Sequence, residues 1–102
     1  MREIEMIRTT LSEEELLCQL AEECNELGKA ALKLRRALNG KNYTPVTEEQ
    51  ARADLLEEMA DVELCLEVLG LNTASFAQLV GEIWAEKLPR WTSRLASKEV
   101  QV

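Results

Sequence analysis

The chain has 102 residues, is 46% hydrophobic and 30% charged, and carries a formal net charge of −7. This acidic balance argues against sequence-independent nucleic-acid binding, because such binding depends on neutralising phosphates. Three cysteines without a single histidine argue against a zinc site and against a Cys–His nucleophile.

The N-terminal segment, residues 1–11, lacks the apolar run of a signal peptide, and no part of the chain approaches the roughly 20 apolar residues of a membrane span. We expect one helical domain over residues 1–102, with flexible ends at 1–11 and 97–102. The cysteines, Cys18, Cys24 and Cys65, form no CxxC pair. They are typical of reduced packing residues in a cytoplasmic protein. Since no apolar span is long enough for a bilayer, we expect no membrane partner.

The first long helix is predicted to begin after Ser12, because Ser12 and Glu15 have the spacing of a capping box. Gly40 is a natural stop, and a loop containing Pro45 follows. Between these signals the apolar residues recur at helical spacing, at Leu16, Leu20, Cys24, Leu27, Ala31, Leu34 and Leu38.

The second helix is predicted to begin with a capping box of Thr47 and Gln50 and to end at Gly70. Its main apolar seam consists of Ala51, Leu55, Met59, Val62, Leu66 and Leu69, and a second row on the opposite side consists of Leu56, Ala60, Leu64 and Val68. A helix that is apolar on two sides is buried on two sides. Since three helices of one small chain can hardly cover both, we predict an all-α antiparallel helical bundle completed by homo-oligomerisation, as a dimer or tetramer.

A third helix is predicted to open at Asn72 or Thr73, and Pro89 is predicted to end it or to begin a short further helix. Trp84 lies on its apolar stripe, which favours a core position over stacking on a base. The other members of this stripe are Phe76, Leu79, Val80 and Ile83.

Four carboxylates are predicted to converge between the first two helices. At about 100° per residue, Glu23 and Glu26 lie about 60° and 120° to one side of the first apolar seam, and Glu58 and Asp61 lie at the same angles on the second. Two facing antiparallel helices are related by a two-fold axis. Side chains at the same angle and in the same direction from their seams therefore lie on the same side of the hairpin. The two pairs are also at similar heights along the hairpin, given a rise of about 1.5 Å per residue.

A partly buried group of four carboxylates is costly unless it is protonated or neutralised. Mg²⁺ binds such groups through a few carboxylates, waters and substrate phosphates, and Mn²⁺ takes similar ligands. The sequence therefore predicts a Mg²⁺ or Mn²⁺ site, with a solvated acidic surface as the alternative. A di-iron bundle would need ExxH pairs, which this chain lacks.

The segments "EECNEL" and "EEMADVELCL" together resemble the EExxE…ExxD signature of the MazG-like all-α nucleoside triphosphate pyrophosphohydrolases, over roughly residues 12–95. The resemblance implies cleavage of a nucleoside triphosphate to the monophosphate and pyrophosphate, plausibly of non-standard nucleotides. It makes Glu22 a supporting carboxylate that orients or deprotonates the attacking water. The implied metal ligands are Glu23, Glu26, Glu58 and Asp61.

The family also carries a lysine, an asparagine and an arginine beyond this signature, which hold phosphates or base. The corresponding residues here are Lys87, Trp91 and Arg94, so that tryptophan replaces the asparagine, and Pro89 interrupts the segment. Lys87, Arg90 and Arg94 are predicted to clamp the substrate phosphates. The same basic run also fits a solvated C-terminal helix whose dipole favours cations.

Two other functions are compatible with these residues. The first is a non-catalytic helical module of the same fold that binds nucleotides as a sensor or binds another protein. The second is a bundle whose acidic faces bind a basic protein, which accounts for the net charge but not for two carboxylate pairs in register.

Overall fold

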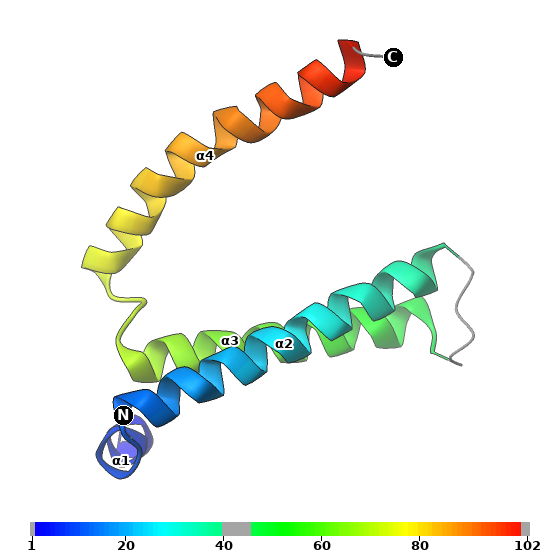
Figure 1. The fold of residues 1–102 in the computed structure, drawn as a ribbon. Coiled ribbons are helices and arrows are strands. Elements are labelled where there is room, and N and C mark those ends of the chain that lie inside the picture. Colours follow the sequence, from blue (N-terminus) through cyan, green and yellow to red (C-terminus); the bar gives the residue numbers. More distant parts are fainter. Residues whose placement is uncertain (1, 40–45, 101–102) are drawn as a thin grey trace. The chain divides into compact units, whose positions relative to one another are not determined.

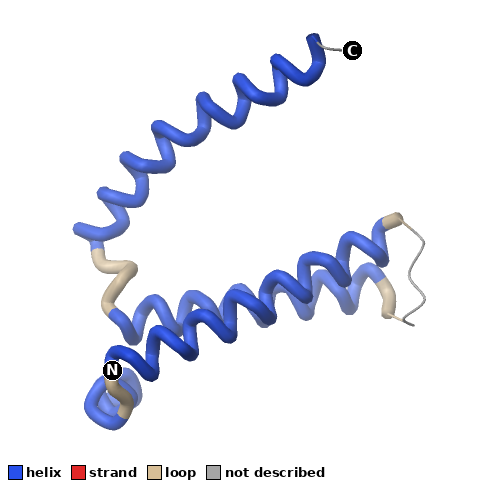
Figure 2. Tube along the Cα trace, in the orientation of Figure 1, coloured by secondary structure: helices blue, strands red, loops and turns tan. Residues whose placement is uncertain are grey.

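The computed structural model describes residues 2–39 and 46–100, and within them all regular secondary structure is helical. The all-α prediction is thereby confirmed (Figures 1 and 2). By its contacts the chain forms two compact units, Met1–Leu71 and Asn72–Val102, which are described separately below; one domain over residues 1–102 stays a prediction. The helices are α1 (Arg2–Thr10), α2 (Glu13–Leu38), α3 (Glu48–Leu69) and α4 (Ala74–Val100).

Helix α2 begins with the predicted capping box. The Ser12 hydroxyl accepts a hydrogen bond from the Glu15 amide at 3.1 Å, and the Ser12 amide donates to the Glu15 carboxylate at 3.1 Å. This reciprocal pair satisfies two of the amides that every helix start leaves without an intrahelical partner. At the other end, Asn39 caps α2, and its amide donates to the Arg35 carbonyl. The predicted stop at Gly40 and the loop containing Pro45 lie outside the described residues.

Helix α3 has the predicted ends, with one difference. Thr47 caps the start by accepting from the Gln50 amide at 3.1 Å, but the side-chain amide of Gln50 donates to Asp54 instead of completing a box. Gly70 ends the helix with φ of 72°, in the left-handed region that glycine adopts without strain. The Leu71 amide then donates to the Leu66 carbonyl, as in a Schellman motif.

Helices α2 and α3 lie side by side as an antiparallel hairpin (Figure 1). An ion pair of 3.1 Å between Lys33 and Asp54 joins the two helices, and both side chains are half-buried. The buried residues of this unit are Leu16, Ala30, Leu34, Ala51 and Val68. Leu16, Leu34 and Ala51 belong to the predicted seams, whereas two other seam residues, Leu38 and Met59, are exposed. All three cysteines are free, but Cys18 and Cys24 are exposed, so the prediction of packing residues holds only for the half-buried Cys65.

Helix α1 was not predicted, because residues 1–11 were expected to be flexible. Residues 2–10 form a helix that packs against the end of α3. Arg8 connects the two, since its guanidinium donates to the carbonyls of Glu67 and Val68, each at 2.9 Å. Both carbonyls belong to the last turn of α3, at the negative end of the helix dipole, and the Glu67 carbonyl also accepts from the Gly70 amide at 3.0 Å.

The second apolar row of α3 is only partly covered within the chain. Val68 is buried at the end of α3 against which α1 packs, whereas Leu56 is 65% and Leu64 is 52% exposed. Ala60, between them, is exposed as well. The predicted burial of α3 on two sides therefore needs a further element or a second chain.

The second unit consists of α4, which is longer than predicted. Thr73 caps it, accepting from the Phe76 amide through its hydroxyl and from the Ala77 amide through its carbonyl. The helix neither ends nor restarts at Pro89, and it extends through Val100, into the tail that was expected to be flexible. A proline inside a helix removes one amide donor and its ring crowds the carbonyl four residues back, yet α4 continues through Pro89.

The apolar stripe of α4 is exposed in this structure. Trp84, expected in the core, has 65% of its surface accessible, and Phe76, Leu79, Val80 and Ile83 are also exposed. No helix within the described residues has an apolar stretch long enough to cross a bilayer.

Candidate metal centre

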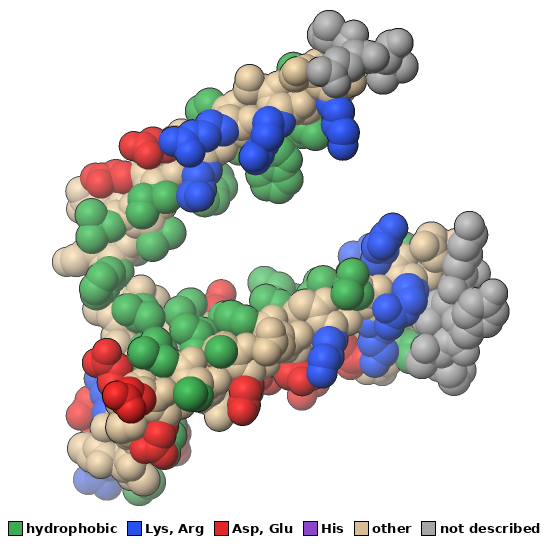
Figure 3. Space-filling view, viewed as in Figure 1, with side chains coloured by type: hydrophobic (Ala, Val, Ile, Leu, Met, Phe, Trp, Pro, Cys, Tyr) green, Lys and Arg blue, Asp and Glu red, His purple; other side chains and the backbone are tan. Residues whose placement is uncertain are grey.

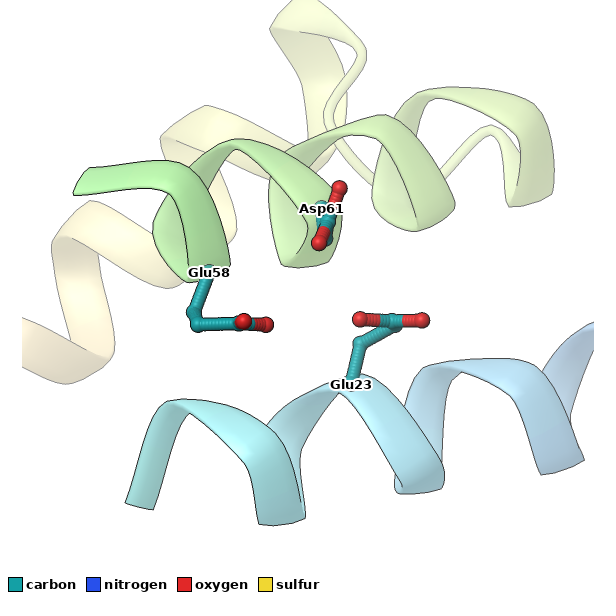
Figure 4. A group of neighbouring side chains, drawn as sticks. All are labelled: Glu23, Glu58 and Asp61. Atoms are coloured by element: carbon teal, nitrogen blue, oxygen red, sulfur yellow. The ribbon is translucent and has the colours of Figure 1, made fainter. Parts of the chain in front are cut away.

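Three carboxylates from two helices converge in the α2–α3 hairpin. Glu23 of α2 and Glu58 and Asp61 of α3 each place an oxygen within 4.8 Å of the others. Figure 4 shows the three side chains meeting in the space between the two helices. All three are half-buried, so the group lies at the edge of the core. Three oxygens at this spacing suit a single divalent cation.

The antiparallel hairpin accounts for this convergence. Glu58 and Asp61 are three residues apart on α3 and therefore share a face, and Glu23 lies on the facing side of α2. Ala30, which is buried, and Cys65 add little side-chain volume nearby. The predicted convergence across the hairpin is thus present for Glu23, Glu58 and Asp61.

The group is electrostatically strained without a cation. Partial burial raises the pKa of Glu58 above its ordinary value, and the charges of Asp61, Glu23, Glu26 and Glu57 raise it further. Like charges at close range disfavour the ionised form. A bound divalent cation would reverse this effect by stabilising the carboxylate.

Cys65 lies beside the carboxylates, and its thiol has a raised pKa. Burial is the largest cause, followed by the negative charges of Glu23 and Asp61. Cys65 is not among the described residues whose ligand atoms lie within 4.8 Å of one another, so the group consists of the three carboxylates.

Gln19 is a residue of the site that sequence reasoning missed. Its side-chain amide donates to Glu23 Oε1 at 2.8 Å. Because Gln19 precedes Glu23 by one helical turn, the two side chains lie on the same face of α2. This spacing is the signal that could have identified Gln19 from the sequence. The hydrogen bond orients the only carboxylate that α2 contributes to the group.

Glu26 does not join the other three predicted ligands. Its side chain is half exposed and forms an ion pair of 3.3 Å with Lys29, one turn further along α2. It is close enough for its charge to raise the pKa of Glu58. Glu26 thus lies next to the group, and the local pair with Lys29 directs its carboxylate away from the shared position.

Glu22 is exposed and lies outside the carboxylate group. Adjacent residues of a helix point about 100° apart, so Glu22 and Glu23 face different directions. Glu22 lines an open surface depression with Ser12, Glu15 and Cys18. Its role as a catalytic carboxylate stays a prediction.

The predicted substrate-binding residues Lys87, Arg90 and Arg94 are exposed on α4. At spacings of three and four residues they lie on one face of that helix, and Figure 3 shows basic side chains along it. They belong to the second unit, whereas the carboxylates belong to the first. Their contact with a substrate stays a prediction.

Two pockets of opposite chemistry adjoin the carboxylate group. The first, of about 270 Å³, has Glu23 and Asp61 in its wall and is otherwise mostly apolar. The second, of about 340 Å³, is polar, and its wall holds three acidic residues, Glu26, Asp54 and Glu58, beside three basic ones. We call the first the apolar pocket, defined by Ile7, Leu11, Leu16, Leu64, Cys65 and Val68, and the second the basic pocket, defined by Lys29, Lys33 and Arg36.

No protein-family model, curated protein or solved structure matches this chain. Its function is therefore inferred from the residues of the hairpin and their geometry.

Proposed function

We propose that this protein is a Mg²⁺-dependent nucleoside triphosphate pyrophosphohydrolase, which cleaves an NTP or dNTP to the monophosphate and pyrophosphate. The observation that supports it is the convergence of Glu23, Glu58 and Asp61 from two helices, with oxygens within 4.8 Å of one another. Acidic groups at protein surfaces are common without an ion, but here the three carboxylates come from two helices and are half-buried, where their repulsion is costly without a cation. The resemblance of the two carboxylate motifs to the MazG-like enzymes supports the same reaction.

The three carboxylates would hold the cation, and Glu26 is near enough to join them if it leaves Lys29. Mg²⁺ suits this donor set because it takes a few carboxylates and fills its remaining positions with water and phosphate oxygens, and Mn²⁺ can replace it. When bound, the ion supplies charge neutralisation for the phosphates and activation of water. The half-buried position of the carboxylates supports tight binding, since the cation relieves their mutual repulsion.

The reaction forms one P–O bond from water to the phosphorus that is attacked and breaks the bridging P–O bond between the α- and β-phosphates. Pyrophosphate leaves, and the protons of water pass to the products and the solvent. The apolar pocket would receive the nucleoside, because Glu23 and Asp61 form part of its wall. Gln19 would hold Glu23 in its ligating orientation. Glu22 is proposed from the family resemblance to orient or deprotonate the attacking water.

We also propose that the active protein is a homo-oligomer in the cytoplasm. The exposed row of α3, with Leu56 and Leu64, and the exposed stripe of α4 support self-association. Apolar surfaces of this extent are typical of interfaces rather than of a monomer's surface. The three free cysteines fit a reducing compartment.

The second candidate is a non-catalytic module that binds nucleotides or another protein. The exposed apolar side chains of α4, including Trp84 and Trp91, favour it, because aromatic residues are enriched at protein interfaces. The two functions differ in whether Glu58 is needed for turnover.

The test is to incubate the protein with a panel of standard and modified NTPs and dNTPs plus Mg²⁺ and to measure pyrophosphate. We expect release that chelation of Mg²⁺ abolishes and that Glu58→Gln lowers by about 100-fold or more, as for the loss of a metal ligand. Glu63→Gln is the matched control, since Glu63 is exposed on α3 and removes the same charge away from the group.

Thermal unfolding separates the two candidates independently of turnover. Mg²⁺ should raise the melting temperature of the parent and of Glu63→Gln, but not that of Glu58→Gln. If no nucleotide in the panel yields pyrophosphate while the fold is intact, the enzyme proposal is wrong. Nucleotide binding by such a protein would then support the module.

A further inference from the structure

We propose that the basic pocket binds the β- and γ-phosphates of the nucleotide and retains them as the pyrophosphate product. Lys29, Lys33 and Arg36 line this pocket together with three carboxylates, those of Glu26, Asp54 and Glu58. The inference rests on the proposed function and adds the orientation of the nucleotide along the hairpin. It places the terminal phosphates on α2, in addition to the predicted role of the basic residues of α4.

The three basic residues form one stripe of α2. Their spacings of four and three residues place them within about 60° of one another around the helix. From Lys29 to Arg36 the stripe spans about 10 Å along the helix axis. That length suffices for two linked phosphates beyond a cation. Figure 3 shows blue side chains gathered on the half of the hairpin near the α2–α3 loop.

One of the three side chains is held in place by α3. Lys33 donates to Asp54 at 3.1 Å, and Asp54 also accepts from the Gln50 side chain at 2.9 Å. The hydrogen bond from Gln50 lowers the pKa of Asp54 most, and Lys33 lowers it further, so Asp54 is ionised and anchors the lysine. A half-buried, anchored ammonium loses less conformational entropy on binding phosphate than a freely moving lysine does.

The other two basic side chains are available to an anion. Lys29 is exposed, and among the described residues it pairs only with Glu26, at 3.3 Å. Arg36 forms no hydrogen bond or ion pair with any described residue, and its planar guanidinium suits two phosphate oxygens at once. A phosphate that takes Lys29 from Glu26 would also free this carboxylate for the adjacent cation. Phosphate and metal binding would therefore support each other.

The proposed orientation of the bound nucleotide follows from the two pockets that adjoin the carboxylates. Glu23 and Asp61 belong to the apolar pocket, and Glu58 belongs to the basic pocket. A nucleotide has the same polarity, with an apolar base at one end and charged phosphates at the other. With the cation at the carboxylates, only one orientation places the base against apolar side chains and the terminal phosphates against cations. Lys29 and Lys33 are paired with Glu26 and Asp54, so Arg36 is the cation of this pocket that has no carboxylate partner among the described residues. In a chain of net charge −7, its guanidinium and a Lys29 released from Glu26 would offset the repulsion of a polyanion.

The test compares Arg36→Gln with Arg35→Gln, which removes the same charge from the neighbouring exposed position outside the pocket. Inorganic pyrophosphate is the first probe, and its binding is measured by calorimetry with Mg²⁺ present. We expect Arg36→Gln and Lys29→Gln each to weaken pyrophosphate binding by about tenfold, the usual value of a charge-assisted hydrogen bond. Arg35→Gln should stay within about twofold, as expected for a screened surface charge.

Further probes identify which part of the nucleotide is bound. A non-hydrolysable NTP should lose about as much affinity as pyrophosphate does in Arg36→Gln, whereas the nucleoside monophosphate should lose little, because it lacks the β- and γ-phosphates. Arg36→Lys should restore part of the affinity. Stabilisation by Mg²⁺ alone should be the same in the parent, in the two Arg36 variants and in Arg35→Gln, since neither arginine belongs to the carboxylate group.

The outcomes separate this inference from the proposed function. If the parent hydrolyses nucleotides but Arg36→Gln and Lys29→Gln behave like Arg35→Gln, the inference is overturned and the enzyme proposal stands. If the parent hydrolyses nothing but its binding of pyrophosphate depends on Arg36, the enzyme proposal fails and the phosphate site stands. Weakened binding of the monophosphate to the same degree as pyrophosphate would place the α-phosphate in the pocket and overturn the stated direction.

Discussion

The α2–α3 hairpin and helix α4 have similar apolar patterns and opposite burial. In the hairpin, Leu16 and Leu34 are buried, and Leu16 lines the apolar pocket beside Glu23 and Asp61. In α4, the corresponding stripe from Phe76 to Leu95 is exposed. A helical apolar stripe therefore shows that a partner is needed, but it does not identify the partner. For α2 the partner is α3, whereas for α4 we propose a second chain.

The first prediction sharpens this difference through the free energy of unfolding. Leu34→Ala should destabilise the protein by about 2–4 kcal/mol, because it leaves a cavity in the hairpin core. Leu79→Ala is the matched change in α4 and, if α4 stays exposed, should cost less than about 1 kcal/mol. Chemical denaturation measures both. Equal losses at low protein concentration would show that α4 is packed within a single chain.

The second prediction concerns the partner of α4. Ile83→Asp places a charge in the middle of the exposed stripe, and burying it in an interface would cost several kcal/mol. We therefore expect the variant to sediment as a monomer at micromolar concentration, while the parent sediments as a dimer or tetramer. Glu82→Gln, on the neighbouring exposed position, should leave the assembly unchanged. A monomeric parent would refute the proposed oligomer.

The third prediction concerns pH and has the smallest expected effect. Because the folded hairpin raises the pKa of Glu58 above its ordinary value of 4.5, the folded state binds the proton more tightly than the unfolded chain. The resulting stability is present below the unfolded pKa and is lost as the pH rises through the folded pKa. The pKa of Glu15 shifts in the opposite direction, because hydrogen bonds from the Ser12 amide and hydroxyl lower it. The stability that Glu15 contributes to the folded state is therefore lost as the pH falls through its folded pKa.

Melting temperatures measured without metal, at pH values below and above 4.5, test both predicted pH dependences, that of Glu58 and that of Glu15. Glu58→Gln should remove the loss of stability above pH 4.5, and Glu15→Gln should remove part of the loss on the acid side. Adding Mg²⁺ should abolish the loss that depends on Glu58, because the cation stabilises the carboxylate. A profile of Glu58→Gln that matches the parent would show that the carboxylates do not interact strongly in solution.

Much of the hairpin could be predicted from the sequence because its signals are local. Ser12, Thr47 and Gly70 mark helix ends through hydrogen bonds and backbone angles within a few residues. The shared side of Glu23, Glu58 and Asp61 follows from helical periodicity and an antiparallel turn. Glu26 is a limit of this method. Helical periodicity predicts the side of the helix on which its side chain lies, but not whether its carboxylate joins the other ligands or pairs with Lys29.

The sequence by itself determined the helical periods, the start of α2, both ends of α3, the start of α4 and the side of the hairpin on which the carboxylates lie. Each of these depends on neighbours one or two turns away. Only the tertiary structure decided that α1 is bound to the end of α3 through Arg8, a residue about sixty positions from its acceptors in the chain. It also decided that Lys29, Lys33 and Arg36 share a pocket with Glu58. Contacts between distant residues depend on how whole helices pack, and no local pattern encodes them.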